Sequence, residues 1–174
     1  FGMNPTPVTQ CRVLELGCGD GSNLIPMAYG LPGSEFVGLD LAARPIANGQ
    51  EMIETLGLKN ITLHALYVMT VTPDFGQFDY IIANQLIEHI IDLDSFLECC
   101  KKLLKDDGLI IFSTPNAGSM YRKLSGKKWI NWHIPYHQQV FTKKSMAFLL
   151  KKHGLEAVRT KIVTPMTWTL HQLH

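Results

Sequence analysis

The stretch VLELGCGDGSN, residues 13–23, places Gly17, Gly19 and Gly21 directly behind an apolar run that contains Glu15. Glycines at this spacing let a chain leave a strand, turn tightly and bring its backbone close to a ligand. A helix that begins behind such a turn offers unpaired N–H groups to an anionic group. Asp40 ends the next apolar run, where a carboxylate can bind both hydroxyls of a ribose. The pattern therefore predicts a nucleoside site.

The position of the third glycine separates two kinds of nucleoside cofactor. A dinucleotide fingerprint, G-x-G-x-x-G, requires glycine at position 22, where this chain has Ser22. Glu15 would also repel a pyrophosphate, whereas it suits a cationic or zwitterionic group. A ligand with a ribose, an ammonium and a carboxylate matches these features. We therefore predict S-adenosylmethionine as the cofactor, with S-adenosylhomocysteine as its product.

The elements that position these residues alternate between strand and helix patterns. Strands are predicted over 12–16, 35–40, 60–66, 78–84 and 108–116, and helices over 22–31, 44–56, from Asp92 or Asp94 to about 104, and from Thr142 to 154. Two last strands, 155–163 and 167–172, are predicted to form a tight hairpin around Thr164-Pro165. The expected fold is α/β: one domain over 1–174 with a doubly wound, Rossmann-like sheet of seven strands. Six would be parallel, and the strand at 167–172 antiparallel.

In this order the motifs resemble those of class I S-adenosylmethionine-dependent methyltransferases. VLELGCGDG is similar to their first motif, FVGLD to their second, and FDYIIANQLIEHI to their fourth-strand segment. The second half, from STPNAG onward, is most similar to small quinone-type and sugar-modifying members. The resemblance implies a cofactor site of these residues: Glu15, Gly17, Cys18, Gly19, Gly21, Asp40, Leu41, Leu66, Tyr67, Asn84 and Gln85.

Within that implied site, Asp40 binds the ribose, Leu41 packs on the adenine, and Asn84 with Gln85 lines the methionine end. Tyr67 is a departure, because many members carry there an acid that contacts the adenine amino group. Three functions stay open. The favoured one is a methyltransferase acting on a small-molecule acceptor; the others are a noncatalytic cofactor-binding or regulatory domain and an NAD-dependent oxidoreductase.

The segment at about 115–141 is longer than a plain connection, for which about 4–6 residues are usual. We predict that it is a lid over the acceptor, although a surface subdomain whose tryptophans pack on the sheet is the alternative. Methyl transfer needs an aligned acceptor, and a hydroxyl acceptor also needs a base, for which histidine is suited. We rank His137 first, then His89 and His133, with Tyr121 or Tyr136 orienting the acceptor. For His89, a capping or packing role is an equal alternative.

No metal site is predicted. His133 and His137 are four residues apart, but Pro135 lies between them and no third ligand follows at a recognisable spacing. The four cysteines show neither metal-ligand nor disulfide spacing.

Charge is distributed unevenly along the chain. Residues 1–119 hold fourteen of the fifteen acids and six of the sixteen bases, a balance of −8, whereas 120–174 hold ten bases and Glu156, a balance of +9. We expect an acceptor that is anionic or presented on an anionic surface, the alternative being a solvated basic face. No recognised nucleic-acid module accompanies the bases. No apolar run predicts a membrane span and no signal peptide opens the chain, so a cytoplasmic protein is expected.

Overall fold

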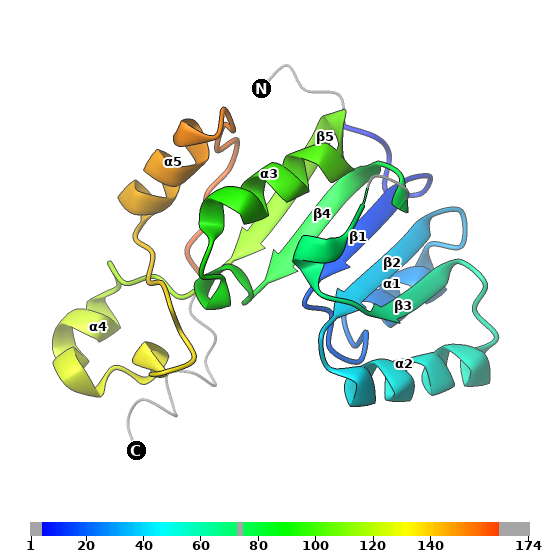
Figure 1. Ribbon diagram of the computed structural model, residues 1–174, viewed down its shortest axis with the longest axis horizontal. Helices are drawn as coiled ribbons and strands as arrows, with labels where there is room; N and C mark the ends of the chain where they lie inside the picture. The colour runs from blue at the N-terminus through cyan, green and yellow to red at the C-terminus, as the bar shows by residue number, and fades with distance from the viewer. Residues whose placement is uncertain (1–4, 73–74, 164–174) are drawn as a thin grey trace. The chain divides into compact units, whose positions relative to one another are not determined.

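The computed structural model describes residues 5–72 and 75–163. Its centre is a sheet of five parallel strands in the order β3-β2-β1-β4-β5 (Figure 1). The strands are β1 (Arg12–Leu16), β2 (Glu35–Asp40), β3 (Ile61–Ala65), β4 (Phe78–Asn84) and β5 (Leu104–Ser113). The α-helices are α1 (Leu24–Gly30), α2 (Ala43–Leu56), α3 (Leu93–Leu103), α4 (Met120–Ser125) and α5 (Lys143–Lys152). Short 3₁₀ turns are η1 (Val68–Thr70), η3 (Ile87–His89), η4 (Gly126–Lys128) and η5 (Ile130–Trp132).

The central strands are buried on both faces, which explains why their sequences are nearly continuous apolar runs. In Figure 1, α1 lies partly behind β2 and β3, α2 lies below β3, and α3 lies in front of β4 and β5. Beneath α1 and α2, Leu24, Ala28 and Ile46 pack with strand residues that include Phe36 and Leu63. On α3 the buried residues are Phe96, Leu97, Cys100 and Leu103, which is the apolar stripe expected from their spacing.

The helix boundaries follow the capping residues in the sequence. Gly57 ends α2 in the left-handed conformation with φ of 66°. Asp92 begins α3 by accepting a hydrogen bond from the Ser95 backbone N–H at 3.0 Å. Thr142 begins α5 with a reciprocal capping box to Ser145. The predicted helix start at Thr142 is thus confirmed, and of the two starts predicted for α3, Asp92 or Asp94, the structure has Asp92.

Among the described residues the sheet has five strands, whereas we predicted seven for the chain. Residues 155–163 form no strand, so the prediction of a strand there is wrong; the predicted antiparallel strand at 167–172 lies outside the described residues. A strand pattern is stable only when a neighbour accepts and donates its ladder hydrogen bonds. Leu155 instead donates its backbone N–H to the Leu150 carbonyl at 2.9 Å, which closes the end of α5.

The described residues fall into two compact units. The first, which we call the sheet unit, comprises 5–86 and 92–113; the second, the insertion unit, comprises 87–91 and 114–163. The insertion unit holds η3, α4, η4, η5 and α5. Within this unit the two ends of the segment 117–141 lie together. The Ala117 backbone N–H donates to the Phe141 carbonyl at 2.7 Å, and Asn116 forms a parallel β-bridge with Phe141. One domain with a lid at about 115–141 stays a prediction.

Among residues 5–72 and 75–163, no helix combines the length and the apolar character that crossing a bilayer requires.

Candidate functional site

The glycine-rich turn after β1 has the conformation that its sequence predicts. Gly17, Gly19 and Gly21 all have positive φ, of 72°, 58° and 78°, where any other residue would be strained. The Gly17 backbone N–H donates to the Leu39 carbonyl at 2.8 Å, which holds the turn against the end of β2. A Cβ added at Gly19 would meet no atom within 4 Å. The turn is therefore fixed in shape, and Gly19 faces open space where a ligand can approach.

Asp40 joins this turn to the carboxyl end of β2. One carboxylate oxygen accepts the Gly19 backbone N–H at 2.8 Å, and the other accepts that of Ala42 at 2.8 Å. Each oxygen keeps a second lone pair for a further donor. The geometry therefore suits the predicted contact of Asp40 with paired hydroxyl groups, and it also gives the carboxylate a role in positioning the turn.

Glu15 is a buried carboxylate that lacks a full set of partners. Its side chain is 2% exposed. One oxygen accepts from the Asn23 amide at 2.9 Å, whereas the other has no hydrogen-bond partner. Burial raises the pKa of this carboxyl to about 7. A buried, half-satisfied carboxylate at a glycine-rich turn is suited to a cationic donor from a ligand, because such a donor would satisfy the oxygen and favour its ionised form.

Cys18 lies below the turn as a packing residue. It is 7% exposed, and burial raises the pKa of its thiol to about 12, with the nearby Asp40 and Glu15 carboxylates acting in the same direction. A Cβ at Gly38 on β2 would approach its sulfur to 2.7 Å, so the two positions fit each other closely. The thiol stays protonated at neutral pH, and its chemistry is that of a small apolar group.

Apolar side chains stand exposed at the carboxyl ends of β2 and β3. Leu41 is 69% exposed, Leu66 37% and Tyr67 47%. They follow the last residues of the two strands, so the sheet brings them to the same edge as Asp40. Exposed apolar groups beside a polar site can cover the faces of a planar ring. This placement is compatible with an adenine site, although Leu41, Leu66 and Tyr67 remain predictions as binding residues.

At the carboxyl ends of β4 and β5, Asn84, Gln85 and Ser113 form one polar group. The Gln85 backbone N–H donates to the Ser113 carbonyl at 2.9 Å, and its side-chain amide donates to the Ser113 hydroxyl at 3.1 Å. That hydroxyl also donates to the Asn84 side chain. Gln85 has a φ of 51°, a strained conformation for a residue with a side chain. Leu86 next to it lies 3.0 Å from the position of a Cβ on Gly17.

A second group of candidate residues gathers within the insertion unit. The ring of His137 lies 4.8 Å from that of His89 and 5.0 Å from that of His133, measured between centroids. His89 Nδ1 lies 3.0 Å from the Tyr136 carbonyl, and His137 Nδ1 lies 2.8 Å from the Asn131 carbonyl. Because a carbonyl only accepts, each Nδ1 carries a proton, and in the neutral tautomer Nε2 is then an acceptor. The structure thus brings His89 into one cluster with His133 and His137, although it lies far from them in the sequence.

Glu88 completes this group and was missed at the level of sequence. It is 1% exposed, and neither carboxylate oxygen has a hydrogen-bond partner. Ligand atoms of Glu88, His89 and His137 all lie within 4.8 Å of one another, a set able to hold a metal ion. Histidines whose second nitrogen bonds a carbonyl are typical of metal ligands. Tyr121 lies on α4 in the same unit and is half-buried.

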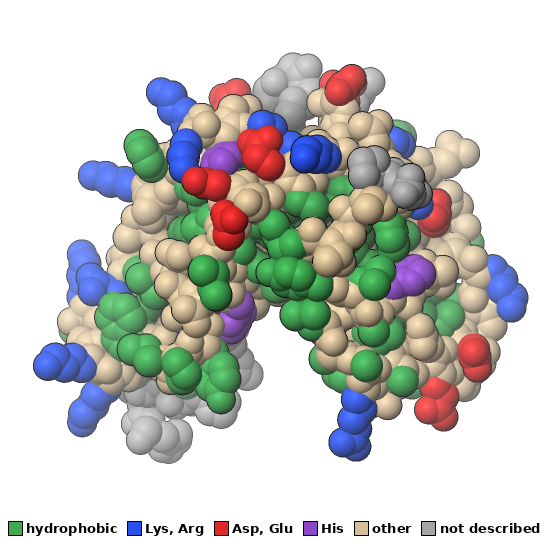
Figure 2. Space-filling model, in the orientation of Figure 1, with side chains coloured by type: hydrophobic (Ala, Val, Ile, Leu, Met, Phe, Trp, Pro, Cys, Tyr) green, Lys and Arg blue, Asp and Glu red, His purple; other side chains and the backbone are tan. Residues whose placement is uncertain are grey.

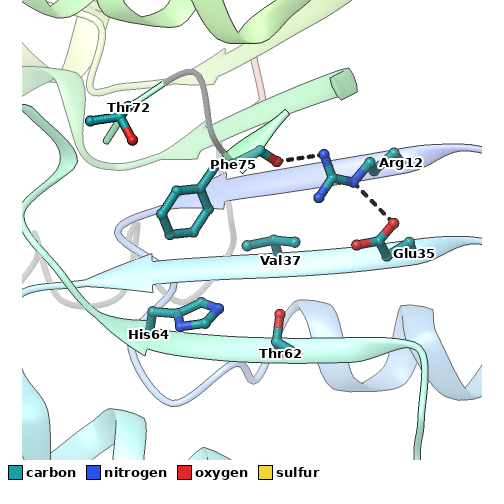
Figure 3. Close-up of a pocket in the computed structure, with 7 residues that line it drawn as sticks. All are labelled: Arg12, Glu35, Val37, Thr62, His64, Thr72 and Phe75. Carbon is teal, nitrogen blue, oxygen red and sulfur yellow. Dashed lines mark hydrogen bonds and ion pairs between the residues drawn. The ribbon is translucent and has the colours of Figure 1, made fainter. Parts of the chain in front are cut away.

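A shallow cleft of about 320 Å³ lies elsewhere in the sheet unit (Figure 3). Its charged residues already bind each other, because Arg12 donates to Glu35 at 3.0 Å and to the Phe75 carbonyl at 2.6 Å. Phe75 in turn packs edge-on to His64 at 5.6 Å. Arg12 and Glu35 begin their strands, far along β1 and β2 from the carboxyl ends. We assign this cleft no ligand.

Three features define a Rossmann-like, nucleoside-binding α/β protein. They are a parallel sheet in the order 3-2-1-4-5, a glycine-rich turn after β1, and an acid at the end of β2. Residues 4–160 match the family described as a methyltransferase domain. The chain belongs to this family, within the class I S-adenosylmethionine-dependent methyltransferase superfamily.

Two curated relatives illustrate the match. An uncharacterised protein of Rickettsia prowazekii is 34% identical over 82% of this chain and 25% of its own length. A ubiquinone biosynthesis O-methyltransferase of Cereibacter sphaeroides is 30% identical over 95% of this chain and 69% of its own length. The chain therefore spans about a quarter of the first relative and just over two thirds of the second.

A solved structure shows the same fold. The structure of PKMT2 from Rickettsia typhi in complex with AdoHcy is 25% identical, with a TM-score of 0.68 over 98% of this chain and 34% of that one. The likeness confirms the Rossmann-like methyltransferase fold predicted from the sequence.

Proposed function

We propose that this protein transfers a methyl group from S-adenosylmethionine to an oxygen of a small-molecule acceptor. The unpartnered oxygen of buried Glu15 is the observation that carries the cofactor assignment. The ammonium group of the cofactor would supply the missing donor, Asp40 the ribose contact, and the open face at Gly19 the space. The name of the Cereibacter relative supports oxygen as the methylated atom.

In the proposed chemistry the protein has two tasks: it orients the acceptor toward the methyl group, and it removes a proton from the acceptor. The bound cofactor supplies an electrophilic methyl group on a sulfonium. The acceptor oxygen would form a new bond to that methyl group as the bond from the methyl group to the sulfur breaks, which leaves S-adenosylhomocysteine, and the acceptor's proton must also leave. His137 Nε2, the free acceptor left by the Nδ1 contact to Asn131, would take that proton. His89 is the second candidate, because its Nδ1 is held in the same way by the Tyr136 carbonyl.

The histidine cluster has a second candidate role, which is to bind a metal ion. The buried carboxylate of Glu88, which has no hydrogen-bond partner, favours this role. Glu88, His89 and His137 would hold a divalent cation, whose charge would lower the pKa of an acceptor hydroxyl. In that case His137 Nε2 binds the metal and does not take the proton. The two roles predict opposite results on chelation, so one experiment separates them.

The first test is binding. Calorimetry with S-adenosylmethionine, its demethylated product and NAD should show binding of the first two and none of NAD. Binding of NAD alone would contradict the assignment. Turnover then separates an enzyme from a noncatalytic cofactor-binding domain: incubation with labelled cofactor and a metabolite extract should transfer label to a small molecule.

The second test replaces His137 by Gln once an acceptor is found. A lost general base should lower kcat by on the order of 10²–10⁴-fold while cofactor affinity stays unchanged. His64→Gln in the sheet unit is the matched control and should leave kcat unaltered. If chelation with EDTA abolishes activity and Mg²⁺ or Zn²⁺ restores it, the cation role is correct and the base role of His137 is wrong.

A further inference from the structure

Three exposed apolar side chains lie beside the proposed ribose contact of Asp40. We call them the apolar rim: Leu41, Leu66 and Tyr67. Leu41 follows Asp40 in the chain, and the Leu66 backbone N–H donates to the Asp40 carbonyl at 2.9 Å. A ribose whose hydroxyls bind the Asp40 carboxylate carries its base on the neighbouring carbon of the sugar ring. The base therefore lies within reach of the apolar rim.

The backbone that presents the Tyr67 ring is held by the turn that follows it. The Tyr67 carbonyl accepts two hydrogen bonds from Thr70, one from its backbone N–H at 2.9 Å and one from its hydroxyl at 2.7 Å. Val68, the first residue of η1, is buried and anchors the turn in the core. Tyr67 thus holds its ring in solvent from a fixed position, next to a fixed carboxylate.

The chain around the apolar rim offers no carboxylate to the amino group of an adenine. Among the described residues, the stretch 57–72 contains no acid. The acids that precede it, Glu51 and Glu54, are exposed on α2, and Figure 2 shows acidic side chains protruding from the outer side of that helix. The Tyr67 carbonyl already accepts from two donors, so both of its lone pairs are occupied.

We propose that the apolar rim binds the purine of the cofactor by its faces, with Tyr67 as the main contact, and makes no hydrogen bond to its 6-amino group. This inference rests on the proposed function, because it takes the nucleoside to be that of S-adenosylmethionine. Stacking on an aromatic ring depends little on the substituents of a base, since every base has a π-face. An apolar site also cannot strongly reject a close analogue, whereas a site built to bond a polar group rejects the analogue that lacks it. The protein should therefore bind cofactors that are altered at the 6-position of the purine.

The test is calorimetry of the full chain with S-adenosylhomocysteine and with its analogue that carries hydrogen in place of the 6-amino group. Neither ligand has a methyl group to transfer, so the measurement needs no methyl acceptor. We expect the two dissociation constants to agree within about threefold. An analogue that binds about tenfold or more weakly would overturn the proposal, because a hydrogen bond from the amino group to a charged acceptor is worth at least that factor. If S-adenosylhomocysteine itself does not bind, the proposed function fails as well, so the two failures are distinguishable.

Two substitutions test the role of the Tyr67 ring. Tyr67→Ala removes the ring and should weaken the binding of both ligands equally, on the order of tenfold. Tyr67→Asp supplies a carboxylate beside the purine, so this variant should prefer S-adenosylhomocysteine to the analogue by about tenfold. Tyr29→Ala and Tyr29→Asp are the matched controls, because Tyr29 lies on α1 and is 70% exposed, and they should bind both ligands as the wild type does. If the Tyr67 variants also match the wild type with both ligands, the ring does not cover the base and the proposal is wrong.

Discussion

Two carboxylates of different character lie on either side of the glycine-rich turn. Asp40 is satisfied by two backbone N–H groups, whereas Glu15 is buried with one oxygen unpartnered. The first can therefore position the turn before any ligand arrives. The second lacks one partner, which a cationic group of the cofactor would supply. At the scale of single residues, these two side chains make the assignment of the cofactor site testable.

Replacing Asp40 by Ala should weaken S-adenosylmethionine binding by about 1.5–3 kcal/mol, the scale of a hydrogen bond to a charged group. Calorimetry measures the affinity. Asp20→Ala is the matched control, because it removes a carboxylate from the same turn that is exposed and bonds only Ser22. An Asp40→Ala protein with wild-type affinity would mean that the ribose does not bind at this position.

Glu15→Gln should stabilise the unliganded protein above neutral pH. The folded state raises the carboxyl pKa from 4.5 to about 7, so its neutral form favours folding, and that contribution is present below 4.5 and lost as the pH rises through about 7. Urea unfolding at pH 8 should show a gain of about 1–3 kcal/mol for Glu15→Gln, and at pH 4.5 almost none. Cofactor binding should nevertheless weaken in the variant. The exposed Glu54→Gln serves as control, and a gain that is equal at both pH values would contradict the raised pKa.

At the scale of elements, the site depends on how closely α2 approaches the glycine-rich turn. Gly49 lies on the buried face of α2. A Cβ at this position would come within 2.3 Å of the Asp20 carbonyl oxygen and 2.5 Å of the Leu63 side chain. The helix can pack against the turn only because this residue has no side chain. The glycine that interrupts the apolar stripe of α2 is therefore a packing requirement of the site.

Gly49→Ala should destabilise the protein by about 1–3 kcal/mol, because backbone on one side of the contact must move. Cofactor binding should weaken as well, since the displaced carbonyl belongs to the turn. Thermal unfolding and calorimetry measure the two effects. Gly30→Ala at the end of α1, where a Cβ meets no atom within 4 Å, should leave both unchanged or raise stability slightly. If Gly49→Ala has the same stability and cofactor affinity as Gly30→Ala, the contact between Gly49 and the Asp20 carbonyl is not tight.

At the scale of the whole molecule, the candidate residues divide between the two units. The sheet unit carries the predicted cofactor residues, and the insertion unit carries the three histidines and most of the bases. Four of those bases, Arg122, Lys123, Lys127 and Lys128, lie in the predicted lid segment. Bases so concentrated raise the local concentration of anions and the rate at which they arrive.

Neutralising these four bases together to Gln should lower kcat/KM for an anionic acceptor at low salt. The difference from wild type should shrink as salt shortens the Debye length from about 10 Å at 0.1 M to about 3 Å at 1 M. The matched control replaces Lys143, Lys144, Lys151 and Lys152 on α5, an equal change of charge in the same unit. Equal efficiency and a flat salt response in all three proteins would mean that the lid bases form only a solvated face.

The sequence alone determined the features that local chemistry controls. Single residues and apolar spacing account for the positive φ at Gly17, Gly19 and Gly21, the cap at Thr142, and β2 at 35–40. The parallel sense of the five described strands also follows, because strand patterns alternate with helix patterns along the chain.

Only the tertiary structure decided which distant residues meet and which buried groups lack partners. His89 and His137 are separated by 48 positions, and no local pattern indicates that their rings lie 4.8 Å apart beside Glu88. The pattern at 155–163 predicted a strand, whereas these residues have no strand in the structure, because apolar and polar spacing alone does not fix the pairing that a strand needs. Pairing, burial and orphaned polar atoms are relations between segments, so they are fixed only when the chain has folded.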